Sequence, residues 1–143
     1  MDGRPQIVLD TNVLVAGLRS PFGASYALLQ VIPWGMCDLH ISVPVVIEYQ
    51  DVLLRRREHL GMSVEEVEFV LDNVCAVARH HNIHFLWRPV LVDPKDEAFL
   101  ELAVAAGARW IVTHNVRHFA GSEVFGVLAI TPLECMSMLR EFA

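Results

Sequence analysis

Carboxylates stand at three places in this sequence where a folded chain could bring them together. Asp10 directly follows the apolar run 7–9, which predicts a buried strand, and Asp96 stands in the first turn of a predicted helix. Glu48 lies on an apolar helix face, where a carboxylate is costly to bury unless it is paired or bound to a metal. Carboxylates that meet repel one another, and a divalent cation removes the conflict. Hard oxygen ligands in small number favour Mg²⁺ or Mn²⁺ over zinc.

Polar residues follow two of the predicted strands in the same way. Thr11 and Asn12 come directly after Asp10, and Thr113-His114-Asn115 follows the short apolar run 110–112. In an open α/β sheet, ligands bind outside the carboxyl ends of the strands, so we expect these side chains to lie near one another. A hydroxyl or amide at 113–115 could hold a metal-bound water.

Each of these residues also has a purely structural interpretation. Thr11 or Asn12 can cap the helix that follows, and Asp93 makes a good N-cap for the next predicted helix start. Glu48 could form a salt bridge to Arg55. The polar residues after the fourth strand could simply form a turn. Taken one at a time, these segments do not decide between structure and chemistry.

Strands alternate with helices along the chain, which predicts an α/β fold with a mainly parallel sheet and helices on both faces. Pro, Gly and capping residues mark the boundaries, such as the capping box of Ser63 and Glu66 at the start of one helix. We expect strands at 6–10, 39–42, 83–87, 110–113 and 127–130, and helices at 12–19, 24–32, 45–57, from 63, 93–106 and 132–142.

The composition indicates a single domain over residues 1–143, with 54% apolar residues and a sizeable core. No apolar stretch approaches the roughly 18 to 20 residues of a membrane helix. The N-terminus runs directly into a strand pattern without a signal peptide, so we expect a cytoplasmic protein. The 3 cysteines are far apart and predict no disulfide framework, and the 7 histidines show no zinc-binding spacing.

The net charge of −6 does not by itself indicate nucleic acid as a partner. An enzyme of nucleic acids would need local basic patches, and two occur in the sequence. Such runs are more often solvated faces than binding sites. The two patches are Arg55-Arg56-Arg57 with His59, and Arg79-His80-His81 with His84 and Arg88.

The segment Val8-Leu9-Asp10-Thr11-Asn12-Val13-Leu14 resembles the opening motif of PIN-domain ribonucleases. Three later segments resemble the other acidic positions of that family, in the same order. They contain Glu48 in 46–49, Asp96 in 93–103 and Asn115 in 112–115. The match spans residues 6 to about 133. Within the family, the chain is most similar to bacterial toxin components of toxin–antitoxin pairs.

The resemblance implies a PIN-like three-layer fold with a central parallel five-stranded sheet in the order 3-2-1-4-5. It implies an endoribonuclease that hydrolyses single-stranded RNA with Mg²⁺ or Mn²⁺, usually as a homodimer. It also implies an antitoxin protein as partner.

The resemblance, with the chemistry above, assigns a role to each candidate residue. Asp10, Glu48 and Asp96 would be the metal ligands, with Asn115 acting directly or through water; Thr11, Asn12 and Thr113 would orient ligands or phosphate, and Asp93 is a peripheral candidate.

The fourth motif departs from the common family pattern. Asn115 stands where many relatives have aspartate, and His118 stands near a position that is often acidic. A metal site with less negative charge would bind a second metal more weakly. An alternative function is therefore a weak or inactive PIN-fold module that binds RNA or a protein. A phosphate-accepting receiver domain fits less well, because the only lysine, Lys95, starts a helix.

Overall fold

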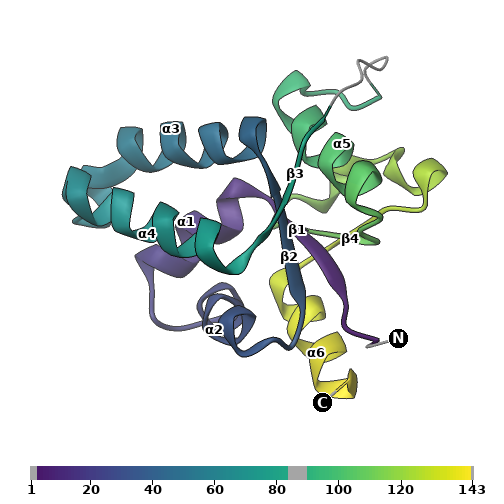
Figure 1. The fold of residues 1–143 in the computed structure, drawn as a ribbon, viewed down its shortest axis with the longest axis horizontal. Coiled ribbons are helices and arrows are strands. Elements are labelled where there is room, and N and C mark those ends of the chain that lie inside the picture. The colour runs from purple at the N-terminus through teal and green to yellow at the C-terminus, as the bar shows by residue number, and fades with distance from the viewer. Residues whose placement is uncertain (1–2, 84–89, 143) are drawn as a thin grey trace.

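Five short parallel strands form the central sheet of the protein (Figure 1). The structure is a computed structural model that describes residues 3–83 and 90–142. The strand order is β3-β2-β1-β4-β5, which confirms the predicted topology. The strands are β1 (Gln6–Leu9), β2 (Asp38–Ser42), β3 (Arg79–His81), β4 (Trp110–Val112) and β5 (Leu128–Ile130).

Helices cover both faces of this sheet and complete the three layers. Helix α5 packs on β1, β2 and β4, while α2 packs against α1 and α6. Figure 1 shows α5 above the strands, α2 and α6 below them, and α3 paired with α4 at one side. The α-helices are α1 (Thr11–Arg19), α2 (Ala24–Val31), α3 (Val43–Leu60), α4 (Val64–Val77), α5 (Glu97–Ala106) and α6 (Pro132–Phe142). Short 3-10 turns lie at η1 (Ile32–Trp34), η2 (Pro94–Asp96), η3 (Val116–Phe119) and η4 (Ser122–Phe125).

The central strand β1 is buried on both faces, as its unbroken apolar sequence predicts. Leu9 pairs in register with Val112 of β4, and the N–H of Asp10 donates to the Val112 carbonyl at 2.9 Å. The chain therefore leaves β1 and β4 at the same edge of the sheet. This pairing brings Asp10 beside Thr113, although more than a hundred residues separate them in sequence.

The third strand of the sheet lies over Arg79–His81, a segment for which no strand was predicted. The strand expected at 83–87 lies, apart from Ile83, outside the described residues. Hydrophobic alternation does not mark this strand, because its side chains bond to polar partners on β2. Arg79 pairs with Asp38 at 3.4 Å, and His81 lies 2.7 Å from His40. The run interpreted as a basic surface patch is thus partly an edge strand, and His84 and Arg88 are outside the described residues.

Two other expectations from composition can be compared with the structure. The three cysteines are free; Cys37 and Cys135 are buried, and Cys75 is half-buried. In the part of the chain that the structure describes, no helix is long and apolar enough to span a membrane.

The predicted capping box at the start of α4 is confirmed. The Ser63 hydroxyl accepts from the Glu66 N–H at 3.1 Å, and the Ser63 N–H donates to the Glu66 carboxylate at 3.0 Å. Ser63→Ala should lower the free energy of unfolding by about 1 kcal/mol, because the first turn loses an acceptor. Urea denaturation measures this loss. Ser137→Ala on an exposed face of α6 is the control and should change stability by less than about 0.5 kcal/mol; equal losses would contradict the assignment.

Candidate functional site

The predicted site residues line one cleft of about 570 Å³ at the carboxyl ends of β1 and β4. The four carboxylates named from the sequence all contribute to its wall. Of the predicted residues, only Thr113 is outside the lining, and it bonds to Asp10 directly. The other predicted residues in the wall are Asp10, Thr11, Asn12, Glu48, Asp93, Asp96 and Asn115.

Thr113 orients Asp10 from below the cleft. Its buried hydroxyl donates to Asp10 Oδ2 at 2.7 Å and accepts from the N–H of Asn115 at 2.9 Å. The Asn12 amide also lies 3.4 Å from this hydroxyl, and its oxygen accepts from the His114 N–H at 3.2 Å. The start of α1 is therefore tied to the loop after β4.

These bonds correct the capping interpretation of Thr11 and Asn12. The N-cap position of α1 is Asp10, and no side chain there caps the helix. The Asn12 side chain instead bonds across the sheet edge to the segment after β4. A sequence pattern favours capping because it contains only local partners, whereas the tertiary fold offers Asn12 a distant one.

Asp10 and Asp96 are held close together in a poorly solvated place. Both are 8% exposed. Burial raises the pKa of Asp10, and the hydrogen bond from Thr113 offsets part of that rise. Burial also raises the pKa of Asp96 to about 6, and the negative charges of Asp10 and Asp93 add to this effect. His118, 3.8 Å from Asp96, lowers it in part. The cleft therefore disfavours its own carboxylate charges.

The donor set fits a hydrated hard cation. Asp96 Oδ2 is buried and has no hydrogen-bond partner among the described residues, so a cation would satisfy it. In the same described part of the chain, no three His, Cys, Asp or Glu side chains form a ready-made metal cluster. Mg²⁺ commonly binds proteins through one or two carboxylates and keeps several waters. The site therefore suits Mg²⁺ or Mn²⁺ better than a fully protein-coordinated zinc ion.

Comparison with known proteins identifies the fold family. The model of the PIN-domain family matches residues 6–117, which is most of the chain. The chain belongs to the PIN-domain family. PIN domains are typically nucleases and generally depend on metal.

A chain in a solved structure has the same fold as this PIN domain. It belongs to the crystal structure of VapBC2 from Rickettsia felis bound to a DNA fragment from their promoter. The TM-score is 0.61 with 16% sequence identity, and the match covers 88% of this chain and 98% of that chain. At this identity the likeness concerns the fold alone. A search of the curated proteins found no match.

The remaining acidic residues of the PIN domain contribute differently to the cleft. Glu48 is half-buried on α3, and the suggested salt bridge to Arg55 does not form, because Arg55 bonds Asp51 at 3.0 Å. One oxygen of Asp93 accepts from the Lys95 N–H at 2.9 Å, which confirms its capping role. Asp93 nevertheless stays in the cleft wall, where its charge acts on Asp96.

Three cationic side chains in the cleft wall were not singled out together from the sequence. They are Arg19 at the end of α1, Arg56 on α3 and Lys95 in η2. None of them has a salt-bridge partner among the described residues. The sequence could have indicated Arg56, because it lies eight residues after Glu48 on the same predicted helix, about two turns away on a similar face. No sequence pattern indicated Arg19, since only the tertiary fold brings it to this cleft.

The raised pKa of Asp96 predicts a pH-dependent stability. The folded protein holds this proton more tightly than the unfolded chain, so stability without metal should fall as pH rises from about 4 through 6. Asp96→Asn removes the ionisation and should raise the free energy of unfolding at pH 7.5 by about 1–3 kcal/mol. At pH below about 4 the two proteins should differ little.

Urea denaturation in chelator at both ends of this pH range tests the effect. Glu141→Gln, at an exposed carboxylate on α6, controls for the change in net charge and should leave stability nearly unchanged. If metal-free Asp96→Asn is less stable than wild type at pH 7.5, the ionised Asp96 side chain does not destabilise the fold, and the prediction is wrong.

Proposed function

We propose that this PIN domain is a Mg²⁺- or Mn²⁺-dependent endoribonuclease that hydrolyses phosphodiester bonds in single-stranded RNA. The observation that carries the proposal is the pair Asp10 and Asp96, two buried carboxylates of raised pKa that face one cleft. One oxygen of Asp96 has no hydrogen bond among the described residues and only the more distant His118 ring, at 3.8 Å, beside it. Such a pair is poorly stabilised without a cation. The nuclease character of the family supports the same conclusion.

The proposed chemistry needs no nucleophilic side chain. Asp10, Glu48 and Asp96 would hold the cation, which when bound stabilises charge on the phosphate and lowers the pKa of water. Thr113 keeps Asp10 Oδ2 in a fixed orientation through its hydroxyl. The Asn115 side chain lines the cleft and can hydrogen-bond a water or a phosphate oxygen.

The cations of the cleft wall support an RNA substrate in a protein of net charge −6. Four carboxylates in the cleft repel a polyanion, and Arg19, Arg56 and Lys95 give the RNA backbone an attractive contact near them.

We also propose that the enzyme is a toxin neutralised by a protein antitoxin, and that it forms a homodimer. The likeness in fold to VapBC2 and the motif resemblance to toxin components support an antitoxin partner. Large apolar side chains exposed on the surface, such as Phe22 at 83% and Trp34 at 77%, support contacts with other chains.

One observation favours a second function, an RNA- or protein-binding module without catalysis. The fourth motif position holds Asn115 rather than an acid, and no ready-made cluster of three ligands occurs among the described residues. A site of lower charge binds metal more weakly, so the same fold could bind RNA without cutting it.

The first test is cleavage of a labelled single-stranded RNA by the pure protein. Cutting should require Mn²⁺ or Mg²⁺, stop in chelator, and fall by at least about a hundredfold in Asp10→Asn, because a direct metal ligand is removed. Equal cutting by Asp10→Asn would reveal a contaminating nuclease. No cutting, together with no Mn²⁺ binding by calorimetry, would favour the binding module instead.

The three cationic side chains in the cleft wall predict how RNA binding should depend on salt. In an Asp10→Asn background, which leaves the RNA intact, adding Arg19→Gln and Arg56→Gln should weaken binding and flatten its dependence on salt. The slope of log affinity against log salt should fall by about 0.7 for each phosphate that the protein no longer neutralises. Fluorescence anisotropy measures both. Arg109→Gln combined with Arg140→Gln is the control, because it removes the same two charges at exposed positions outside the cleft lining, and an identical effect there would mean that only net charge matters.

A further inference from the structure

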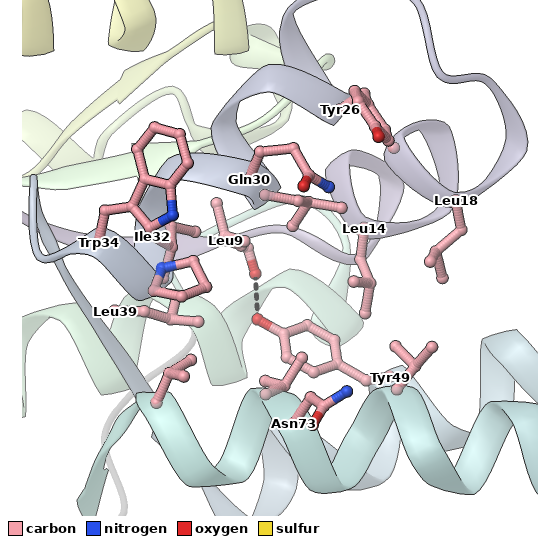
Figure 2. A pocket seen from close by; sticks show the side chains of 16 residues that line it. Leu9, Leu14, Leu18, Tyr26, Gln30, Ile32, Trp34, Leu39, Tyr49 and Asn73 are labelled. Carbon is pink, nitrogen blue, oxygen red and sulfur yellow. Dashed lines mark hydrogen bonds between the residues drawn. The ribbon is translucent and has the colours of Figure 1, made fainter.

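A second cavity lies directly behind the carboxylate cleft. It encloses about 490 Å³ and is lined mainly by apolar side chains, including Leu14, Leu39 and Trp34 (Figure 2). Neighbouring residues of the chain face the two spaces. Leu9 and Tyr49 line the apolar cavity, whereas the residues beside them in sequence, Asp10 and Glu48, line the cleft. The wall between the two spaces is therefore built by β1 and α3.

Tyr49 joins α3 to β1, the two elements of this wall, by one hydrogen bond. Its side chain is 1% exposed, and its hydroxyl donates to the carbonyl of Leu9 at 2.6 Å. Figure 2 shows the Tyr49 hydroxyl pointing at the Leu9 carbonyl, with the hydrogen bond drawn as a dashed line. Because Leu9 precedes Asp10 and Tyr49 follows Glu48, the bond ties together the backbones that carry these two carboxylates.

The same ring also contacts the element that carries the third carboxylate. The rings of Tyr49 and Phe99 lie 6.3 Å apart between centroids and are tilted by 40°. Phe99 follows Asp96 by three residues, about one helical turn, and lines the carboxylate cleft. Tyr49, itself on α3, thus contacts both β1 and α5. Strand β1 ends directly before Asp10, α3 carries Glu48, and α5 begins directly after Asp96.

Packing and the hydroxyl together hold Tyr49 in this place. The ring is buried in the core against Phe99, and the hydroxyl bond to Leu9 fixes the far end of the ring on β1. Without this bond, α3 could shift toward the cavity and carry Glu48 away from Asp10.

We infer that Tyr49 is a positioning residue that sets the spacing of Asp10, Glu48 and Asp96 for cation binding. The inference rests on the proposed metal site, and it concerns affinity for the cation, not the RNA chemistry. Tyr49→Phe removes only the hydroxyl. It should weaken Mn²⁺ binding by about tenfold or more, as removal of a group that orients metal ligands typically does.

Calorimetric titration of the metal-free protein with Mn²⁺ tests this, with thermal unfolding in chelator measured alongside. Tyr26→Phe is the matched control, since it removes a hydroxyl from the lining of the same cavity without a bond to β1. Val67→Ala, in the buried core of α4, is the control for stability. Val67→Ala should lower the melting temperature by several degrees and leave Mn²⁺ affinity unchanged. Tyr26→Phe should change neither strongly.

Two results would overturn the inference. One is a Tyr49→Phe protein whose Mn²⁺ affinity stays within twofold of wild type. The other is an equal loss of affinity in Val67→Ala, which would show that general destabilisation is the cause. Phe99→Leu tests the contact between the two rings, and it should weaken Mn²⁺ binding less than Tyr49→Phe.

The outcomes for the proposed function and for Tyr49 are distinguishable. If wild type binds Mn²⁺ but cuts no RNA, the proposed activity fails, while the Mn²⁺ affinity of Tyr49→Phe still tests the role of Tyr49. If wild type binds no Mn²⁺, the proposed activity and the inference about Tyr49 both fail.

Discussion

Two carboxylates buried in one cleft are the constraint on which the rest of this structure depends. Asp10 and Asp96 come from different layers of the fold, and the charge of Asp10 makes Asp96 harder to ionise. Keeping them together requires compensating bonds, and the structure supplies them unequally. Asp10 receives a hydrogen bond from Thr113, whereas Asp96 keeps a buried oxygen without such a bond among the described residues. This imbalance supports the proposal that the site binds a cation.

Hydrogen bonds between β1 and the segment after β4 surround this pair on one side, and an apolar cavity lies on the other. Parallel pairing of β1 with β4 fixes Asp10 against Thr113, and the side chain of Asn12 bonds to the same loop. On the far side, an apolar cavity lies behind Tyr49. We infer that two hydrogen bonds, from Thr113 to Asp10 and from Tyr49 to Leu9, help to set the spacing of the acidic groups. Charge is also unevenly distributed, because a chain of net charge −6 has three cationic side chains in the wall of the cleft proposed to bind RNA.

The prediction from sequence failed where local patterns do not carry the deciding interaction. The third strand was missed because Arg79 and His81 bond to partners on β2 that are about forty residues away. Capping of the following helix was one structural alternative for Thr11 or Asn12, yet the Asn12 side chain bonds to the backbone N–H of His114, just after β4. Arg55 was offered to Glu48, although Asp51 lies one helical turn before it and bonds it instead.

The sequence by itself determined the alternation of strands and helices and named the carboxylates that the cleft brings together. The alternation follows from apolar periodicity and from Pro, Gly and capping residues, which are local signals. The carboxylates stood out because they follow a strand, start a helix or lie on an apolar helix face. The strand order came only from the resemblance to a known family. Only the tertiary structure decided which groups interact: that Thr113 bonds Asp10, that Arg19 reaches the cleft, and that Tyr49 ties Leu9 to α3. Such contacts join residues far apart in the chain, and their distances and burial, which set pKa values and bond partners, exist only once the sheet and its helices have packed.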